Sequence, residues 1–283
     1  MPRVLIAGCG FVGLATARLL HASGWSVLGC THSAESAHAL AAEPFRVVAA
    51  DLTVPAALEA LADWRGCESV IHCASSGRGG ADAYRAVYLG GARNLLAALA
   101  PQQLLFTSST SVYAQNDGAW VTEENPAEPD RETGRILRET EDLVLAHGGC
   151  VARLAGIYGP GRSVLLKKFF TGEAVIEGDG SRWINQIHRD DIAAALALLV
   201  DQSARGVFNV SDDTPMTQLE VYSWLAAHFA RPLPPTGPLD TNRKRGVTSK
   251  RVSNAKLRSL HWAPRFRSLC EAVEIDRELR PAN

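Results

Sequence analysis

The sequence of 283 residues lacks several features that would restrict its class at once. No apolar run approaches the roughly 20 residues that a membrane-spanning helix needs. Its six cysteines form no C-x-x-C pair and no metal-ligand spacing, so we predict buried free thiols and no metal site. A formal net charge of −1 argues against nucleic acid or a membrane surface as the main partner.

We also expect no secretory signal peptide, because the first residues lack its pattern. Pro2-Arg3 leads straight into an apolar run, which leaves no room for a charged region and a cleavable hydrophobic segment. With 46% apolar residues, the chain has enough of them for one large α/β domain and a smaller appendage. We therefore expect a globular protein of the cytoplasm.

What is present is most specific in the first thirteen residues. A short apolar run ends at Gly8, and Gly10 and Gly13 follow in G-x-G-x-x-G spacing before a helical pattern. Gly8 permits a tight turn, Gly10 lets the backbone approach a pyrophosphate, and Gly13 lets helix and strand pack closely. The pyrophosphate would lie on free N–H groups at the helix N-terminus. A tight turn of an α/β protein is the simpler alternative. The cofactor-binding residues predicted here are Gly8, Gly10, Phe11, Val12 and Gly13.

The end of the second predicted strand, residues 25–30, bears on which dinucleotide binds. A carboxylate there would hold the ribose hydroxyls of NAD, but the sequence continues Thr31-His32-Ser33 with no acid before Glu35. These three side chains can donate hydrogen bonds to a 2′-phosphate, which a carboxylate would repel. The pattern favours NADP and leaves NAD open. His32 is the predicted cofactor contact, with an ordinary surface histidine as the alternative.

Apolar strands alternate with helical patterns through the first half of the chain. The predicted strands are 3–7, 25–30, 45–49, 69–73, 103–108 and 150–155, and the predicted helices are 12–22, 34–41, 55–63, 81–99 and 135–147. Such alternation predicts a Rossmann-type, doubly wound parallel sheet covered by helices on both faces. Ligands of such sheets bind beyond the carboxyl ends of the strands.

The pattern loosens after residue 156. We predict a dinucleotide-binding Rossmann domain over 1–156 and a smaller C-terminal substrate lobe over 157–283, with some segments returning to the Rossmann core. In the second part we expect strands at 174–177 and 206–210 and helices at 190–201 and 217–229. The proline-rich stretch 231–238 cannot be helical, and it introduces a basic loop at 243–251.

Further motifs run in order across nearly the whole chain. They are Asp51-Leu52, Ile71-His72-Cys73-Ala74-Ser75, Gly91 to Leu96, Thr107 to Tyr113, Arg153 to Gly161, Asn185 to Asp191 and Phe208 to Ser211. Together with the glycine motif, they resemble the extended short-chain dehydrogenase/reductases, the NAD-dependent epimerase/dehydratase group.

The resemblance assigns further site residues. It implies cofactor contacts at Asp51, Leu52, Cys73, Ala74, Ser75 and Ile157, and a catalytic serine at Ser109. It also implies a nucleotide-diphosphate sugar as substrate, near Tyr158, Arg162 and His188. Arg162 is a predicted phosphate ligand, with surface solvation as the alternative. Helices 81–99 and 135–147 are where this family commonly forms homodimers, and the sequence leaves the oligomeric state open.

The sequence departs from the family at the catalytic pair. The family uses a tyrosine and a lysine four residues apart on one helix, where the lysine lowers the pKa of the phenol that moves the substrate proton. Aligning Gly134 and Glu141 with the family pattern puts Thr133 in the tyrosine position and Leu137 in the lysine position. No tyrosine lies between Tyr113 and Tyr158. Tyr113, four residues after Ser109, is therefore a candidate acid, with a packed aromatic as the alternative.

Two interpretations follow. In the first, the chain is an NAD(P)-dependent oxidoreductase or epimerase of atypical mechanism that acts on a hydroxyl or carbonyl of a small, nucleotide-linked molecule, and Ser109 and the complete glycine motif favour it. In the second, it is a catalytically silent NAD(P)-binding sensor, which Thr133 and Leu137 favour. Resemblance of fold does not choose between them.

Overall fold

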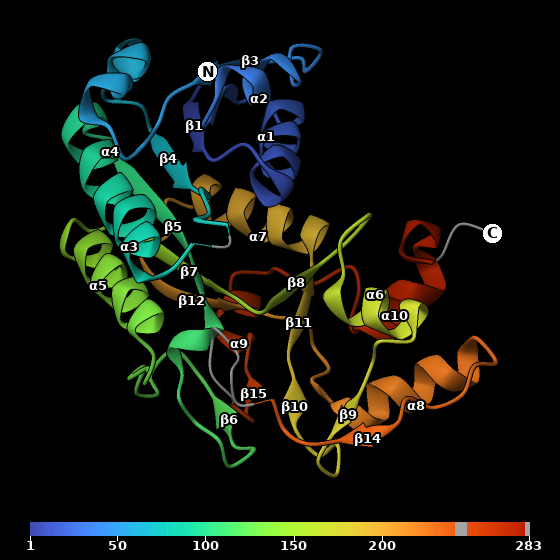
Figure 1. Cartoon of the computed structure of the whole chain (residues 1–283). Coiled ribbons are helices and arrows are strands. Elements are labelled where there is room, and N and C mark those ends of the chain that lie inside the picture. The colour runs from blue at the N-terminus through green and yellow to red at the C-terminus, as the bar shows by residue number, and fades with distance from the viewer. Residues whose placement is uncertain (78, 241–247, 281–283) are drawn as a thin grey trace.

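A seven-stranded, all-parallel sheet forms the centre of the molecule (Figure 1). The computed structural model describes residues 1–77, 79–240 and 248–280. The strand order is β12-β7-β5-β4-β1-β2-β3. These strands are β1 (Arg3–Ala7), β2 (Ser26–Thr31), β3 (Arg46–Ala49), β4 (Ser69–His72), β5 (Gln103–Ser109), β7 (Cys150–Leu154) and β12 (Gly206–Val210). The predicted Rossmann-type α/β fold is confirmed.

The strands are rich in apolar residues because both faces of the sheet are covered. Val4, Leu5 and Ile6 of β1 are fully buried, and they point alternately into the two hydrophobic cores. The order of strands reverses between β1 and β4, which pair with each other. Chain crossovers leave a crevice at such a reversal, so the carboxyl ends of β1 and β4 are where a ligand is expected.

Helices cover the two faces in separate layers. On one face α1 (Phe11–Ala22) packs against α7 (Arg189–Asp201). On the other face lie the 3-10 helix η1 (Pro55–Trp64), α4 (Gly91–Leu99) and α5 (Glu132–Ala146). Figure 1 shows α4 and α5 side by side across the sheet from α1 and α7.

The predicted helix 81–99 consists of three consecutive pieces. These are α3 (Ala81–Tyr84), the π-helix η2 (Arg85–Gly90) and α4. π-Helical turns are rare inside α-helices and frequently mark functional sites. The short helix α2 (Ala34–His38) follows β2, and its N-cap is Ser33, whose hydroxyl accepts the N–H of Ser36.

A smaller lobe has a hydrophobic core of its own. Its helices are α6 (Val164–Thr171), α8 (Gln218–His228) and α10 (Leu269–Ile275), which surround Phe169, Tyr222 and Phe266. Short two-stranded pairs lie outside the central sheet. They are β8 (Gly156–Tyr158) with β11 (Gln186–His188), β10 (Trp183–Ile184) with β13 (Met216–Thr217), β14 (Thr236–Gly237) with β9 (Ile176–Glu177), and β15 (Arg251–Val252) with β6 (Trp120–Val121).

The remaining elements are short. They are the 3-10 turns η3 (Thr110–Val112) and η4 (Arg277–Leu279) and the helix α9 (Ala255–Arg258). Of the predicted basic loop, residues 243–247 lie outside the described residues. Among the residues that the structure does describe, no helix is both long and apolar enough to cross a membrane.

Candidate cofactor and active site

The three glycines of the turn after β1 face different surroundings. Gly8 has a φ of +101°, and a Cβ there would lie 2.3 Å from the Ala74 nitrogen. A Cβ on Gly13 would lie 2.2 Å from the Gly8 carbonyl oxygen, so these two glycines are required by the protein's own packing. Nothing lies within 4 Å of a Cβ on Gly10. Space for a ligand is therefore left at the middle glycine.

A cavity of about 390 Å³ extends from this turn along the carboxyl ends of the strands. It is lined by nine of the predicted cofactor residues: Gly8, Gly10, Phe11, Val12, His32, Cys73, Ala74, Ser75 and Ile157. Ser109 and Leu137 lie on its wall as well. Gly13 lies behind the turn, where it packs helix α1 against the strand. The tertiary structure thus brings segments that are far apart in the sequence to one site.

A second, smaller cavity of about 80 Å³ adjoins the first at Gly8, Ala74 and Ser75. Asp51 and Leu52, which follow β3, line it. Partial burial of the Asp51 carboxylate is outweighed by hydrogen bonds from the backbone N–H and hydroxyl of Thr53, so its pKa is held below the usual value. A hydrogen-bonded carboxylate beside an apolar side chain suits the polar edge and the face of a purine ring.

The polar residues after β2 have different roles in the fold. The Thr31 hydroxyl donates to the Ser33 carbonyl at 3.2 Å, and the Ser33 hydroxyl caps α2. The His32 side chain is 80% exposed, lines both cavities and has its Nδ1 3.6 Å from the Asp51 carboxylate. Of the three residues, His32 is the one whose side chain is not occupied by backbone groups.

Ser109 is the last residue of β5 and faces the larger cavity. Its hydroxyl accepts the N–H of Ser111 at 3.2 Å, which fixes the side chain at the strand end. The neighbouring Ser108 also lines the cavity, but its hydroxyl donates to the buried Glu141 carboxylate at 2.5 Å. Ser109 is therefore the serine whose proton is not held by a buried carboxylate.

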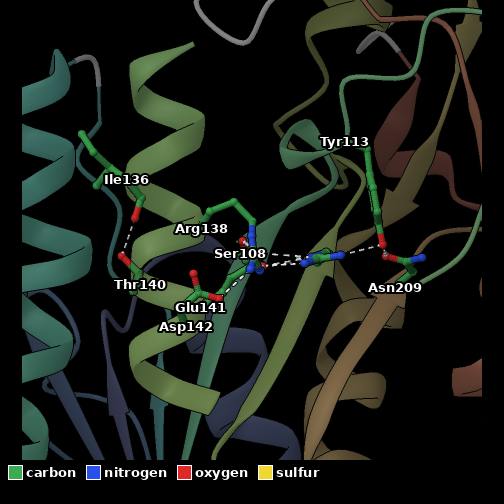
Figure 2. A network of polar contacts seen from close by, with 9 residues as sticks. Ser108, Tyr113, Ile136, Arg138, Thr140, Glu141, Asp142 and Asn209 are labelled. Carbon is green, nitrogen blue, oxygen red and sulfur yellow. Dashed lines mark hydrogen bonds and ion pairs between the residues drawn. The ribbon is translucent and has the colours of Figure 1, made fainter. Parts of the chain in front are cut away.

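Tyr113 points away from this cavity into a buried polar network (Figure 2). Its hydroxyl donates to the side-chain oxygen Oδ1 of Asn209 at 2.9 Å and accepts from Arg153 Nη1 at 2.8 Å. Arg153 in turn binds Glu141. Burial raises the pKa of the Tyr113 phenol, although Arg153 opposes the shift. This placement suits a side chain that joins β5, β7 and β12 better than one that exchanges protons with a ligand.

Two of the three predicted substrate residues, Tyr158 and His188, are fully buried. The Tyr158 hydroxyl donates to the Ser268 carbonyl at 3.5 Å, and the rings of Tyr158 and His188 meet edge to face. His188 accepts the N–H of Asp190 at 3.2 Å and lies 3.4 Å from the Asp276 carboxylate. Burial lowers the pKa of His188. In the described structure these residues join α7 to the small lobe, whereas Arg162 lines the cavity.

Sequence reasoning missed two phenols on the cavity wall. Tyr84 and Tyr88 lie one helical turn apart at the junction of α3 and η2, and their rings pack edge to face at 4.9 Å. Tyr88 also packs on Phe106 of β5. In sequence they are aromatic residues of an ordinary amphipathic segment. The only local signal is their spacing of four residues, which is equally typical of a core-facing helix.

Comparison with known proteins gives the same picture. The model of the NAD dependent epimerase/dehydratase family matches residues 4–211. Protein YeeZ of Escherichia coli K12 is 30% identical over 272 residues, which cover 90% of this chain and 94% of YeeZ. A provisionally named NAD-dependent epimerase/dehydratase of Methylobacillus flagellatus is 30% identical, with a TM-score of 0.80 over 97% of each chain.

A more distant structure has the same fold. The dTDP-glucose 4,6-dehydratase of Bacillus anthracis, solved with NAD, is 16% identical and has a TM-score of 0.79 over 99% of this chain and 98% of its own. The fold and site thus define a Rossmann-type protein of the extended short-chain dehydrogenase/reductase class. The chain belongs to the NAD-dependent epimerase/dehydratase family, as its motifs predicted.

The residues present fit the family's dinucleotide. Gly10 leaves open space beside the N-terminus of α1, where backbone N–H groups are available to a pyrophosphate. Asp51 and Leu52 would hold the adenine, and Ser109 and Ile157 lie at the other end of the site. No His, Cys, Asp and Glu cluster suited to a metal ion occurs among the residues described.

Proposed function

We propose that this protein is an NADP-dependent enzyme that oxidises, reduces or epimerises a hydroxyl or carbonyl group of a small, nucleotide-linked substrate. The observation that carries the proposal is the single cavity that connects Gly10 with Ser109. A dinucleotide bound along it would supply a hydride acceptor or donor at the end where Ser109 lies. The substrate would enter between the sheet and the smaller lobe of α6, α8 and α10.

In this mechanism Ser109 orients the substrate oxygen by a hydrogen bond, as the family resemblance implies. The proton is carried by a phenol of the cavity wall, Tyr84 or Tyr88, because Tyr113 is engaged in the buried network. Cys73, a thiol that lines the same cavity, is disfavoured because burial raises its pKa to about 12. Leu137, which takes the family's lysine position, lines the cavity but carries no charge that could assist this proton transfer.

A nucleotide sugar is the leading substrate class. The dTDP-glucose 4,6-dehydratase with the same fold acts on such a molecule by its name. The test is a screen of nucleotide sugars for product formation and for a change in NADPH absorbance, with Ser109→Ala as control. Turnover that is lost in Ser109→Ala supports the proposal. Turnover that Ser109→Ala leaves intact contradicts this mechanism, and cofactor binding without any turnover would favour the silent sensor.

The preference for NADP rests on His32 and on the missing acid at the end of β2. NADPH should raise the unfolding temperature more than NADH at equal concentration, because only NADPH carries the 2′-phosphate. In His32→Asp, NADH should raise the unfolding temperature more than NADPH. A carboxylate repels the 2′-phosphate and accepts hydrogen bonds from the ribose hydroxyls of NADH. An equal or larger stabilisation of the wild type by NADH would contradict the preference.

A further inference from the structure

Arg162 reaches the cofactor cavity from outside the glycine motif. It belongs to the tight turn after β8, where the backbones of Gly159 and Arg162 exchange two hydrogen bonds of 2.9 Å. Its guanidinium carbon lies 5.1 Å from the centroid of the Phe11 ring. Phe11 follows Gly10 directly and starts α1. The side chain therefore lies over the turn that should hold the cofactor's pyrophosphate.

A second arginine contacts the same ring but differs in its charge balance. Arg189, the first residue of α7, has its guanidinium carbon 5.2 Å from the Phe11 centroid. Its Nε donates to the Asp190 carboxylate at 2.8 Å, so its charge is compensated. In the described parts of the chain, no carboxylate lies within ion-pair distance of Arg162. Arg162 thus brings an uncompensated positive charge to the cavity wall.

The glycine turn adds partial positive charge of its own. Helix α1 has no acidic residue in its first turn and no side-chain cap, and Gly10 leaves the approach to its N–H groups open. A guanidinium and several backbone N–H groups therefore face one cavity. Such a set of donors matches an anion with several oxygens, above all a diphosphate.

We propose that Arg162 binds the diphosphate bridge of the cofactor, with the Phe11 ring holding the guanidinium in place. This role rests on the proposed cofactor binding. It makes Arg162 a ligand of the cofactor, whereas the sequence predicted a ligand of the substrate. A nucleotide sugar carries a diphosphate too, so the chemistry alone fits both ligands. The cofactor is favoured because Phe11 belongs to the glycine turn.

Calorimetric titration separates the two sources. Arg162→Gln should bind NADPH about tenfold more weakly than the wild type, and ADP-ribose, which keeps the diphosphate but lacks nicotinamide, should weaken by the same factor. Arg189→Gln is the matched control, because Arg189 contacts the same ring but is already paired; its NADPH affinity should stay within about twofold. Arg162 is exposed, so its variant should unfold at the wild-type temperature without ligand.

The possible outcomes are distinct. If the wild type binds neither NADPH nor NADH, the proposed function fails. If the wild type binds NADPH and Arg162→Gln binds it equally well, only the role of Arg162 is wrong. If Arg162→Gln keeps its NADPH affinity but binds UDP-glucose more weakly, Arg162 holds the substrate's diphosphate instead.

Discussion

Arg153 and Glu141 form an ion pair of 2.6 Å in which both side chains are almost wholly buried, at 3% and 0% exposure. The pair joins β7 to α5, and the hydroxyls of Ser108 and Tyr113 complete it (Figure 2). The carboxylate also accepts from Arg138 at the edge of the network. Charges removed from water in this way are stable only while each keeps its partner.

Glu141→Gln should therefore lower the free energy of unfolding by about 3 kcal/mol, because it leaves the Arg153 guanidinium buried without a countercharge. Chemical denaturation measures this loss. Glu139→Gln, two residues away on α5, is the control: it breaks an exposed pair with Arg85 and should change stability little. Equal effects of the two variants would refute the structural importance of the buried pair.

Tyr113→Phe should cost about 1–2 kcal/mol of stability, since Arg153 and Asn209 each lose a buried partner. Because Tyr113 does not line the cavity, cofactor affinity should not change. Ser109→Ala should show the reverse pattern, with normal stability and lost turnover. Denaturation combined with NADPH titration distinguishes the two. A Tyr113→Phe protein of wild-type stability that has lost all turnover would instead make Tyr113 the catalytic acid.

The glycines of the turn should respond differently to a single methyl group. Gly13→Ala should destabilise the fold by about 1–3 kcal/mol, because the Cβ meets the Gly8 carbonyl oxygen at 2.2 Å. Gly10→Ala should keep wild-type stability, as its Cβ enters open space, but should weaken NADPH binding about tenfold or more. Normal NADPH affinity in Gly10→Ala would show that the ligand does not approach this turn.

His72 predicts a pH dependence of stability. Burial lowers the pKa of this histidine to about 4, while its Nε2 lies 3.1 Å from the Val87 carbonyl. The unfolded chain takes up the proton near pH 6.5, so stability should fall as the pH drops from 6.5 to 4, by about 1.4 kcal/mol per pH unit. His72→Gln removes this contribution. Between pH 4 and 7, the denaturation midpoint should change less with pH in the variant than in the wild type. An equal pH dependence of the two proteins would contradict the lowered pKa of His72.

Much of the fold was predictable because its signals are local. The runs that became β1 and β4 have apolar residues at their centres, as expected for strands that are covered on both faces of the sheet. Gly8 and Gly13 could be assigned from spacing alone, since the turn itself demands them. The π-helical turn η2 was not foreseen, because its residues keep the periodicity of an ordinary helix.

The candidate site was less predictable. His32, Ser109 and Arg162 line the predicted cavity, but Tyr158 and His188 are buried in the joint between α7 and the small lobe. A polar residue beside a glycine motif looks the same in sequence whether its side chain faces a ligand or a neighbouring helix. Burial decides between these cases, and burial depends on segments far along the chain.

The sequence by itself determined the glycine turn and the apolar runs that became the strands of the sheet, because each depends on residues that are neighbours in the chain. Only the tertiary structure decided which side chains line the cavity. It directs Tyr113 into the network of Arg153 and Glu141, and it brings Tyr84, Tyr88 and Arg162 to the cavity. The physical reason is that side-chain direction at a strand end or helix turn is set by packing between distant elements, which no local pattern encodes.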